Sequence, residues 1–179
     1  AYDAADTEND NLAIGYDALG GAIAGGEYNV AIGNYSLDAN TSGDNNVAIG
    51  YNTLTANTTG YSNTASGFKA LEKNTIGDHN TAVGNGALYS NIEGNFNTAS
   101  GSEALFANTY GEDNTASGWR ALYANTTGDY NTASGYRALW ANSTGDRNIA
   151  IGYMAYDAAD TENDNLAIGY DALGGAIAG

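Results

Sequence analysis

The most constraining feature of this chain is a short internal repeat. An asparagine, then a threonine or aliphatic residue, and then an alanine recur throughout, 17 residues apart in eight intervals and 18 apart in the first. Such a fixed period predicts stacked repeats, because a unit of this size cannot bury a core alone. The repeated asparagines, position 1 of each unit, are Asn11, Asn29, Asn46, Asn63, Asn80, Asn97, Asn114, Asn131, Asn148 and Asn165.

A second, longer period lies above the first. Residues 1–25 recur unchanged as residues 155–179, so the sequence repeats itself after 154 residues. We therefore expect residues 1–179 to form one continuous domain that is an excerpt of a longer repetitive fibre.

The length of the unit favours an all-β fold. Helical repeats need about 33–47 residues and leucine-rich repeats about 20–29, so this unit is too short for either. We predict an all-β β-solenoid, a parallel β-roll of about ten 17-residue rungs with two short strands in each rung. In the sequence N-T-A-S-G the side chains alternate, so positions 1, 3 and 5 share one face. The glycine at position 15, often followed by aspartate, is typical of a turn.

Stacking turns equal positions into columns along the axis. The position-1 asparagines predict a ladder whose amides bond to each other or to the turn backbone. A second asparagine column is expected at position 12, and we interpret both as structural rather than as a track for a polar ligand. The position-12 residues are Asn40, Asn57, Asn74, Asn91, Asn108, Asn125 and Asn142.

Positions 2 and 4 are aliphatic in some units and carry hydroxyl groups in others. If positions 1, 3 and 5 point inward, positions 2 and 4 point outward, and aliphatic pairs in register there indicate an interface with another chain. The alternative is that this face lines the core and the alanines face solvent. The predicted interface residues are Val30, Ile32, Val47, Ile49, Ile149 and Ile151.

Aromatic residues predict two more columns, at positions 6 and 10. Rings in such rows pack over small-residue cores or between filaments, or they stack on glycans. We favour packing, with glycan binding as the alternative. The rings are Tyr16, Tyr51, Phe68, Trp119, Tyr136, Tyr153 and Tyr170 at position 6, and Tyr89, Phe106, Tyr123 and Trp140 at position 10.

The composition argues against several classes of function. The 21 acidic and 5 basic residues give a formal net charge of −16, which repels nucleic acid. No apolar run approaches the roughly 20 residues of a membrane-spanning helix, so we expect no membrane span. His79 is the only histidine, cysteine is absent, and no nucleophile or phosphate-binding motif occurs. We therefore expect no enzyme, no catalytic residue and no cofactor.

One acidic segment is a weak candidate for calcium. Asp160, Glu162 and Asp164 place carboxylates at alternating positions, and calcium prefers oxygen ligands. The segment lacks the glycine of a calcium-binding loop, so a solvated acidic turn is the competing interpretation.

Five N-x-S/T sequons also occur. Most of them follow from the Asn-Thr-rich turns, so their number alone indicates nothing about glycosylation. They begin at Asn34, Asn40, Asn57, Asn125 and Asn142.

The units NTASGYRALWANSTGDR and NVAIGYNTLTANTTGYS resemble repeats of bacterial and phage tail-fibre-domain proteins. They also resemble the head β-roll of trimeric autotransporter adhesins, where N-x-x-A-I-G-like motifs recur. The resemblance covers essentially the whole chain. It implies a parallel β-roll, usually a homotrimer, whose outward aliphatic strand positions face the trimer axis.

Together these patterns favour a structural protein. We expect the shaft of an extracellular fibre or fibril, at a cell or virion surface, that assembles with itself by stacking of rungs and lateral packing of chains. The alternative is a binding module, either a surface or glycan adhesin or an ice-binding β-solenoid. The outward hydroxyl array that would serve ice binding is Thr64, Ser66, Thr81, Thr98, Ser100, Thr115, Ser117, Thr132 and Ser134.

Overall fold

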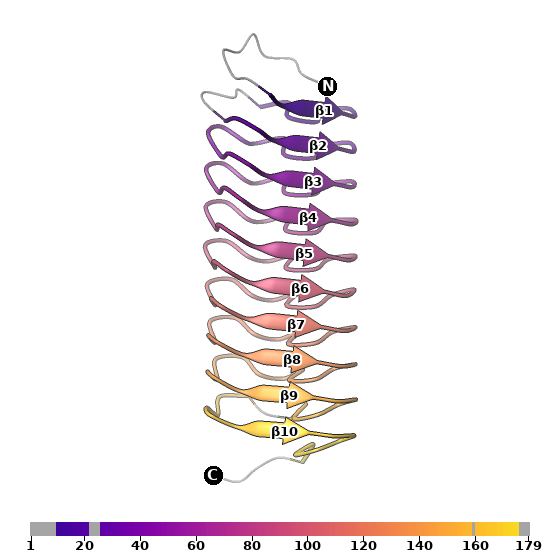
Figure 1. Cartoon of the computed structure of the whole chain (residues 1–179), viewed down its shortest axis with the longest axis vertical. Helices are drawn as coiled ribbons and strands as arrows, with labels where there is room; N and C mark the ends of the chain where they lie inside the picture. The colour runs from indigo at the N-terminus through magenta and orange to yellow at the C-terminus, as the bar shows by residue number, and fades with distance from the viewer. Residues whose placement is uncertain (1–9, 22–25, 159, 176–179) are drawn as a thin grey trace.

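The chain winds into a straight stack of rungs (Figure 1). The computed structural model describes residues 10–21, 26–158 and 160–175. Across these residues the secondary structure is all-β, without a helix. The strands are β1 (Leu12–Ile14), β2 (Val30–Ile32), β3 (Val47–Ile49), β4 (Thr64–Ser66), β5 (Thr81–Val83), β6 (Thr98–Ser100), β7 (Thr115–Ser117), β8 (Thr132–Ser134), β9 (Ile149–Ile151) and β10 (Leu166–Ile168).

The ten strands form one parallel sheet in chain order, and equal positions of successive units lie opposite each other. Leu12 pairs with Val30 and Ile14 with Ile32, and the same register continues to β10. This arrangement confirms the predicted β-solenoid with a 17-residue rung. It also means that every position of the unit becomes a column along the axis.

The predicted second strand of each rung is wrong for the described residues, which contain one strand per rung. At positions 7 and 9 the backbone is left-handed, with φ of 60° at Lys69 and 51° at Leu71, for example. Repeated left-handed residues turn the chain too sharply for an extended strand. Hydrogen bonds between rungs persist there, as in Lys69 N–H to Tyr51 O at 3.0 Å and Leu71 N–H to Ala87 O at 3.0 Å.

The core is narrow and made mostly of alanine, leucine and asparagine. The alanine at position 3, in the middle of the strand, is buried in each rung from Ala31 to Ala167, and positions 8 and 9 are buried beside it in every one of these rungs except the last. Position 9 is leucine in most rungs and Tyr156 in one. Since alanine faces inward, positions 2 and 4 face outward, which excludes the alternative in which the aliphatic face lines the core.

The glycine at position 15 allows neighbouring turns to stack closely. A Cβ added to Gly77 would lie 2.6 Å from Gly94 O and 2.5 Å from Asn74 Oδ1. Real Cβ atoms do not approach other atoms so closely, so a side chain there would push the rungs apart. The turn signal of the sequence therefore reflects crowding between rungs.

Candidate functional site

The position-1 asparagines are built into the backbone of the stack. From Asn11 to Asn148, the Oδ1 atom of each one accepts a hydrogen bond from the backbone N–H of the position-1 asparagine in the next rung, at 2.8–3.0 Å. The Nδ2 atom donates across its own rung, as from Asn80 to Gly94 O at 2.8 Å. All members from Asn29 to Asn148 are buried. Both ends of each amide are thus used inside the fold.

The position-12 asparagines form a second buried ladder, in which the side-chain amides of neighbouring rungs bond to each other. Asn91 Nδ2 donates to Asn74 Oδ1 at 2.7 Å and to Gly94 O at 2.9 Å. Asn108 Nδ2 donates in turn to Asn91 Oδ1 at 2.9 Å. Because Gly94 O also accepts from Asn80, the two asparagine columns meet at one carbonyl oxygen, and the same holds in the other rungs that carry a position-12 asparagine. These contacts leave no amide of the two asparagine columns free for a ligand in the middle of the stack.

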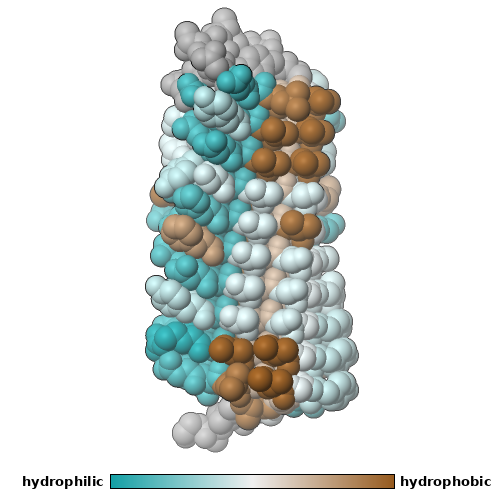
Figure 2. All heavy atoms as spheres, viewed as in Figure 1, coloured by the Kyte–Doolittle hydropathy of each residue, from teal (hydrophilic) through white to brown (hydrophobic). Residues whose placement is uncertain are grey.

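The outward side chains of positions 2 and 4 form a surface that we call the strand face. Figure 2 shows aliphatic side chains on it near both ends of the stack, separated by rungs that carry mainly hydroxyl groups. Ile49, Ile149 and Ile151 are 40–42% exposed, whereas Val30, Ile32 and Val47 are half-buried. All six predicted interface residues therefore lie on one face, and in this single chain no other element covers them fully.

The aliphatic rungs form a block once the 154-residue period is considered. The aliphatic strands β1, β2 and β3 lie at one end, and β9 and β10 lie at the other. Because the sequence of β10 repeats that of β1, a chain continued with the same period carries four aliphatic rungs and then five from β4 to β8. Those five have threonine at position 2 and serine at position 4, except for Val83. We call the two groups the aliphatic block and the hydroxyl block.

The aromatic columns stack ring on ring along the axis. At position 6, the centroids of Trp119, Tyr136 and Tyr153 are 4.9 and 4.7 Å apart, with interplanar angles of 21° and 5°. At position 10, the rings of Tyr89 and Phe106 are 4.9 Å apart and nearly parallel. Sugars stack on an exposed ring face, but here neighbouring rings cover much of each other. This geometry favours packing over a continuous glycan platform.

Most of the basic side chains lie beside these rings. The Arg137 guanidinium is 4.2 Å from the centroid of the Trp140 ring, and the Lys73 ammonium is 4.9 Å from that of Tyr89. Arg120 lies 4.3 Å from the ring of Trp119 and pairs with Glu103 at 2.6 Å. Sequence analysis missed these cation–π contacts, although the spacing between positions 7 and 10 contains the signal for Arg137 and Trp140.

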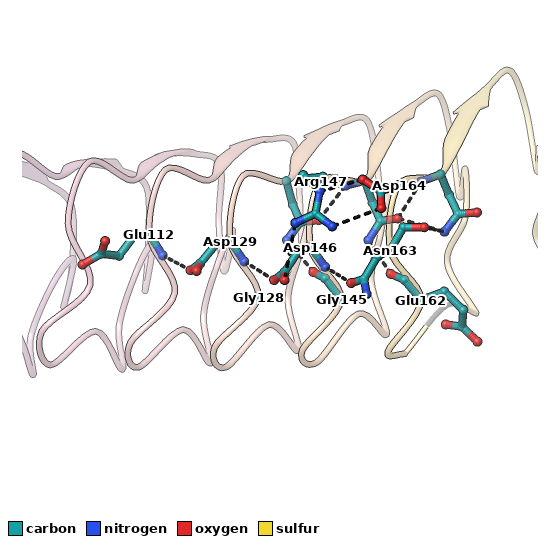
Figure 3. A network of polar contacts seen from close by, with 12 residues as sticks. Glu112, Gly128, Asp129, Gly145, Asp146, Arg147, Glu162, Asn163 and Asp164 are labelled. Carbon is teal, nitrogen blue, oxygen red and sulfur yellow. Dashed lines mark hydrogen bonds and ion pairs between the residues drawn. The ribbon is translucent and has the colours of Figure 1, made fainter.

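A column of acidic and amide side chains follows the turn at position 16 (Figure 3). The backbone N–H of Glu112 donates to Asp129 Oδ1 at 2.8 Å, and that of Asp129 donates to Asp146 Oδ1 at 2.9 Å. The chain of contacts continues from Asp146 to Asn163 Oδ1. The column was not predicted, although an acidic or amide residue recurs at this position. Its carboxylates bind backbone donors and therefore brace the turn.

The three calcium candidates do not converge on one site. Glu162 Oε2 accepts from the backbone N–H groups of Asp160 and Thr161, both at 3.0 Å, and these bonds lower the pKa of Glu162. Asp164 is bonded to Arg147 Nε at 2.6 Å, and this contact lowers its pKa. Asp160 Oδ1 accepts from the Ser143 hydroxyl. The described residues include no cluster of three or more histidine, cysteine, aspartate or glutamate residues arranged to hold a metal ion.

The sequons fall into two groups. Asn40, Asn57, Asn125 and Asn142 belong to the buried position-12 ladder, so a glycan on any of them would break the rung. Asn34 is exposed. Its Oδ1 atom accepts from the backbone N–H of Tyr16 at 3.0 Å.

Other features of a ligand site are absent where the chain is described. His79 is stacked 5.0 Å from the ring of Phe96 and meets Tyr61 edge-on at 5.0 Å. The described part of the stack has no pocket, and no described segment forms a helix long and apolar enough to cross a membrane.

Comparison of the chain with family models, curated proteins and solved structures finds no match. The molecule is a repeat-built β-solenoid, an architecture that suits a structural or binding module.

Proposed function

We propose that this chain is a section of the shaft of an extracellular fibre, at a cell or virion surface. The observation that carries the proposal is the combination of the sheet register with the long period. β1 pairs in register with β2, and the sequence of β10 repeats that of β1. If the chain continues with the same period, the strand after β10 can therefore pair with β10 in the same way that β2 pairs with β1.

The role that we infer is mechanical. Rungs stack through backbone hydrogen bonds and through the two asparagine ladders, so a pull along the axis is resisted by many parallel contacts. An isolated rung buries too little apolar surface to offset its loss of backbone entropy, which makes stacking a condition of folding. The net charge of −16 keeps such rods in solution and limits uncontrolled bundling.

Lateral contact between chains is the second part of the proposal. The aliphatic strands at both ends of the strand face supply apolar surface for packing against other chains. This is the arrangement that the resemblance to tail-fibre-domain and trimeric autotransporter repeats implies, and we propose a homo-oligomeric fibre on the same grounds.

Electron cryo-microscopy tests the shaft directly. We would image the 179-residue chain and a chain extended by one further 154-residue period. The expected result is straight rods with an axial repeat of about 4.8 Å, longer by about 43 Å after the extension, which adds nine rungs. Extended chains that form two separate bodies, or rods that do not lengthen, would refute the shaft.

A binding module remains a second candidate because of the hydroxyl block. The side chains of Thr98, Ser100, Thr115 and Ser117 are exposed on a parallel sheet, where they form a regular array of hydroxyl groups. An ice-recrystallisation assay tests this function, with Thr98→Asp and Thr115→Asp as the disrupting pair. Equal growth of ice crystals with and without the protein would exclude ice binding.

A further inference from the structure

The strand face is distinctive because it carries no charged side chain, as well as because part of it is apolar. None of the twenty side chains at positions 2 and 4 of the ten strands is charged, although the chain carries 21 acidic residues and 5 basic ones. The turn at position 16, by contrast, carries a row of carboxylates that includes Glu112, Asp129 and Asp146. Two copies of so acidic a chain repel each other, and the repulsion is weakest where no charge is present.

We infer that the occupant of the strand face is the strand face of a second copy of this chain, with aliphatic block set against aliphatic block. The inference rests on the proposed fibre and specifies its lateral contact. Another acidic copy can approach along this uncharged surface, and four aliphatic rungs in every nine supply matched apolar area. The hydroxyl block retains water, so it adds little to the attraction.

The pattern of blocks fixes the axial register of the two copies. If one copy moves by one rung, an aliphatic pair on each chain comes to face hydroxyl groups of the hydroxyl block. The apolar area of that aliphatic pair is then no longer buried against apolar side chains of the other copy. The best match therefore returns only after nine rungs, which is the 154-residue period. The long period in the sequence thereby acquires a physical role as the repeat distance between lateral contacts.

The area of the strand face makes the strength of association depend on the length of the chain. Ten strands about 4.8 Å apart, with two rows of side chains, offer roughly 500 Å² for each chain. Stable specific interfaces bury about 800 Å² on each partner, so one copy of this length lies below that range. Each added period contributes a similar area to a contact that is already formed. The chain should therefore associate weakly by itself and much more tightly when it is extended.

Sedimentation velocity on the chain and on the chain extended by one period tests the inference. The disrupting variant carries Val30→Thr, Ile32→Ser, Val47→Thr and Ile49→Ser in every period. It should fold, because it copies the T-A-S strands that occur from β4 onward. The matched control exchanges hydroxyl groups in β6 and β7, with Thr98→Ser, Ser100→Thr, Thr115→Ser and Ser117→Thr.

We expect the extended chain to dimerise at least tenfold more tightly than the shorter chain. We also expect the disrupting variant to raise the dissociation constant at least tenfold, while the control leaves it unchanged. The circular dichroism spectra of the disrupting variant and of the control should match that of the unmodified chain. Monomers at every length, or equal association by the disrupting variant and the control, would overturn the inference. Rod length in electron micrographs is independent of this result, so single rods without pairing would leave the shaft standing.

Discussion

The buried position-12 ladder allows a quantitative prediction, which Asn91→Ala tests in the middle of the stack. The Asn91 amide makes three hydrogen bonds, at 2.7 Å to Asn74 Oδ1, at 2.9 Å to Gly94 O and at 2.9 Å from Asn108 Nδ2. Gly94 O keeps its bond from Asn80, whereas Asn74 Oδ1 is left buried without a donor.

The expected cost follows from these contacts. A buried polar atom that loses its partner costs about 1–3 kcal/mol, and the net contribution of a neutral hydrogen bond is about 0.5–1.5 kcal/mol. The stranded acceptor and the loss of the other two bonds together give a decrease of about 3–5 kcal/mol in the free energy of unfolding. The small cavity that the alanine leaves acts in the same direction.

Urea unfolding followed by far-ultraviolet circular dichroism measures this decrease. Asn85→Ala is the matched control, because Asn85 lies in the same rung and its side chain is exposed. We expect the control to change the stability by no more than about 0.5 kcal/mol. If Asn91→Ala and Asn85→Ala lower the free energy of unfolding equally, the buried ladder does not stabilise the fold.

Three further changes test other parts of the stack. Gly77→Ala should cost at least about 2 kcal/mol, because the new Cβ would lie 2.6 Å from a carbonyl oxygen of the next rung. Denaturant titration checks this, and Gly86→Ala, whose Cβ would lie 3.4 Å from a ring carbon, should cost less. Tyr156→Leu should raise the stability by about 1–2 kcal/mol, because the Tyr156 hydroxyl is buried and has no partner among the described residues; a lower melting temperature would contradict this. Arg147→Gln should return the lowered pKa of Asp164 to the ordinary range, as followed by NMR titration of the carboxyl carbon. The Arg147–Asp164 contact stabilises the fold above that range and is lost as the pH falls through the lowered pKa, so an unchanged pKa in the variant would refute the pairing.

Much of the fold was predictable because the repeat makes each position a column. The alternation in N-T-A-S-G placed Ala48 and its equivalents inward, and the structure agrees. The prediction of a second strand in each rung was wrong, and the sequence itself contains the reason. Ala70 and Leu71 are neighbours and are both buried, which alternating strand side chains do not allow. The consecutive apolar pair at positions 8 and 9 of most units therefore indicated a turn.

The surfaces were less predictable than the core. The position-16 column depends on backbone N–H groups that point along the axis, and side-chain patterns do not report those directions. The contacts of Arg137 with the ring of Trp140 depend on left-handed residues in the turn, which propensity does not predict for arginine. The exposure of Ile49 and Ile151 followed directly once the alanine was known to face inward.

The asparagine ladders also give the stack a direction. From Asn57 to Asn142, each position-12 amide donates to the oxygen of the rung before it, so the amide dipoles of the column are aligned head to tail. Asn142 Oδ1, the last acceptor of the column, has no partner among the described residues. The position-1 ladder spans the stack from Asn11 to Asn165 in the same sense, with each backbone N–H donating to the Oδ1 atom of the rung before it, so the two ends of the stack are chemically different. Growth by addition of chains should therefore be faster at one end than at the other, and two rods cannot join end to end in opposite senses without leaving like groups facing each other.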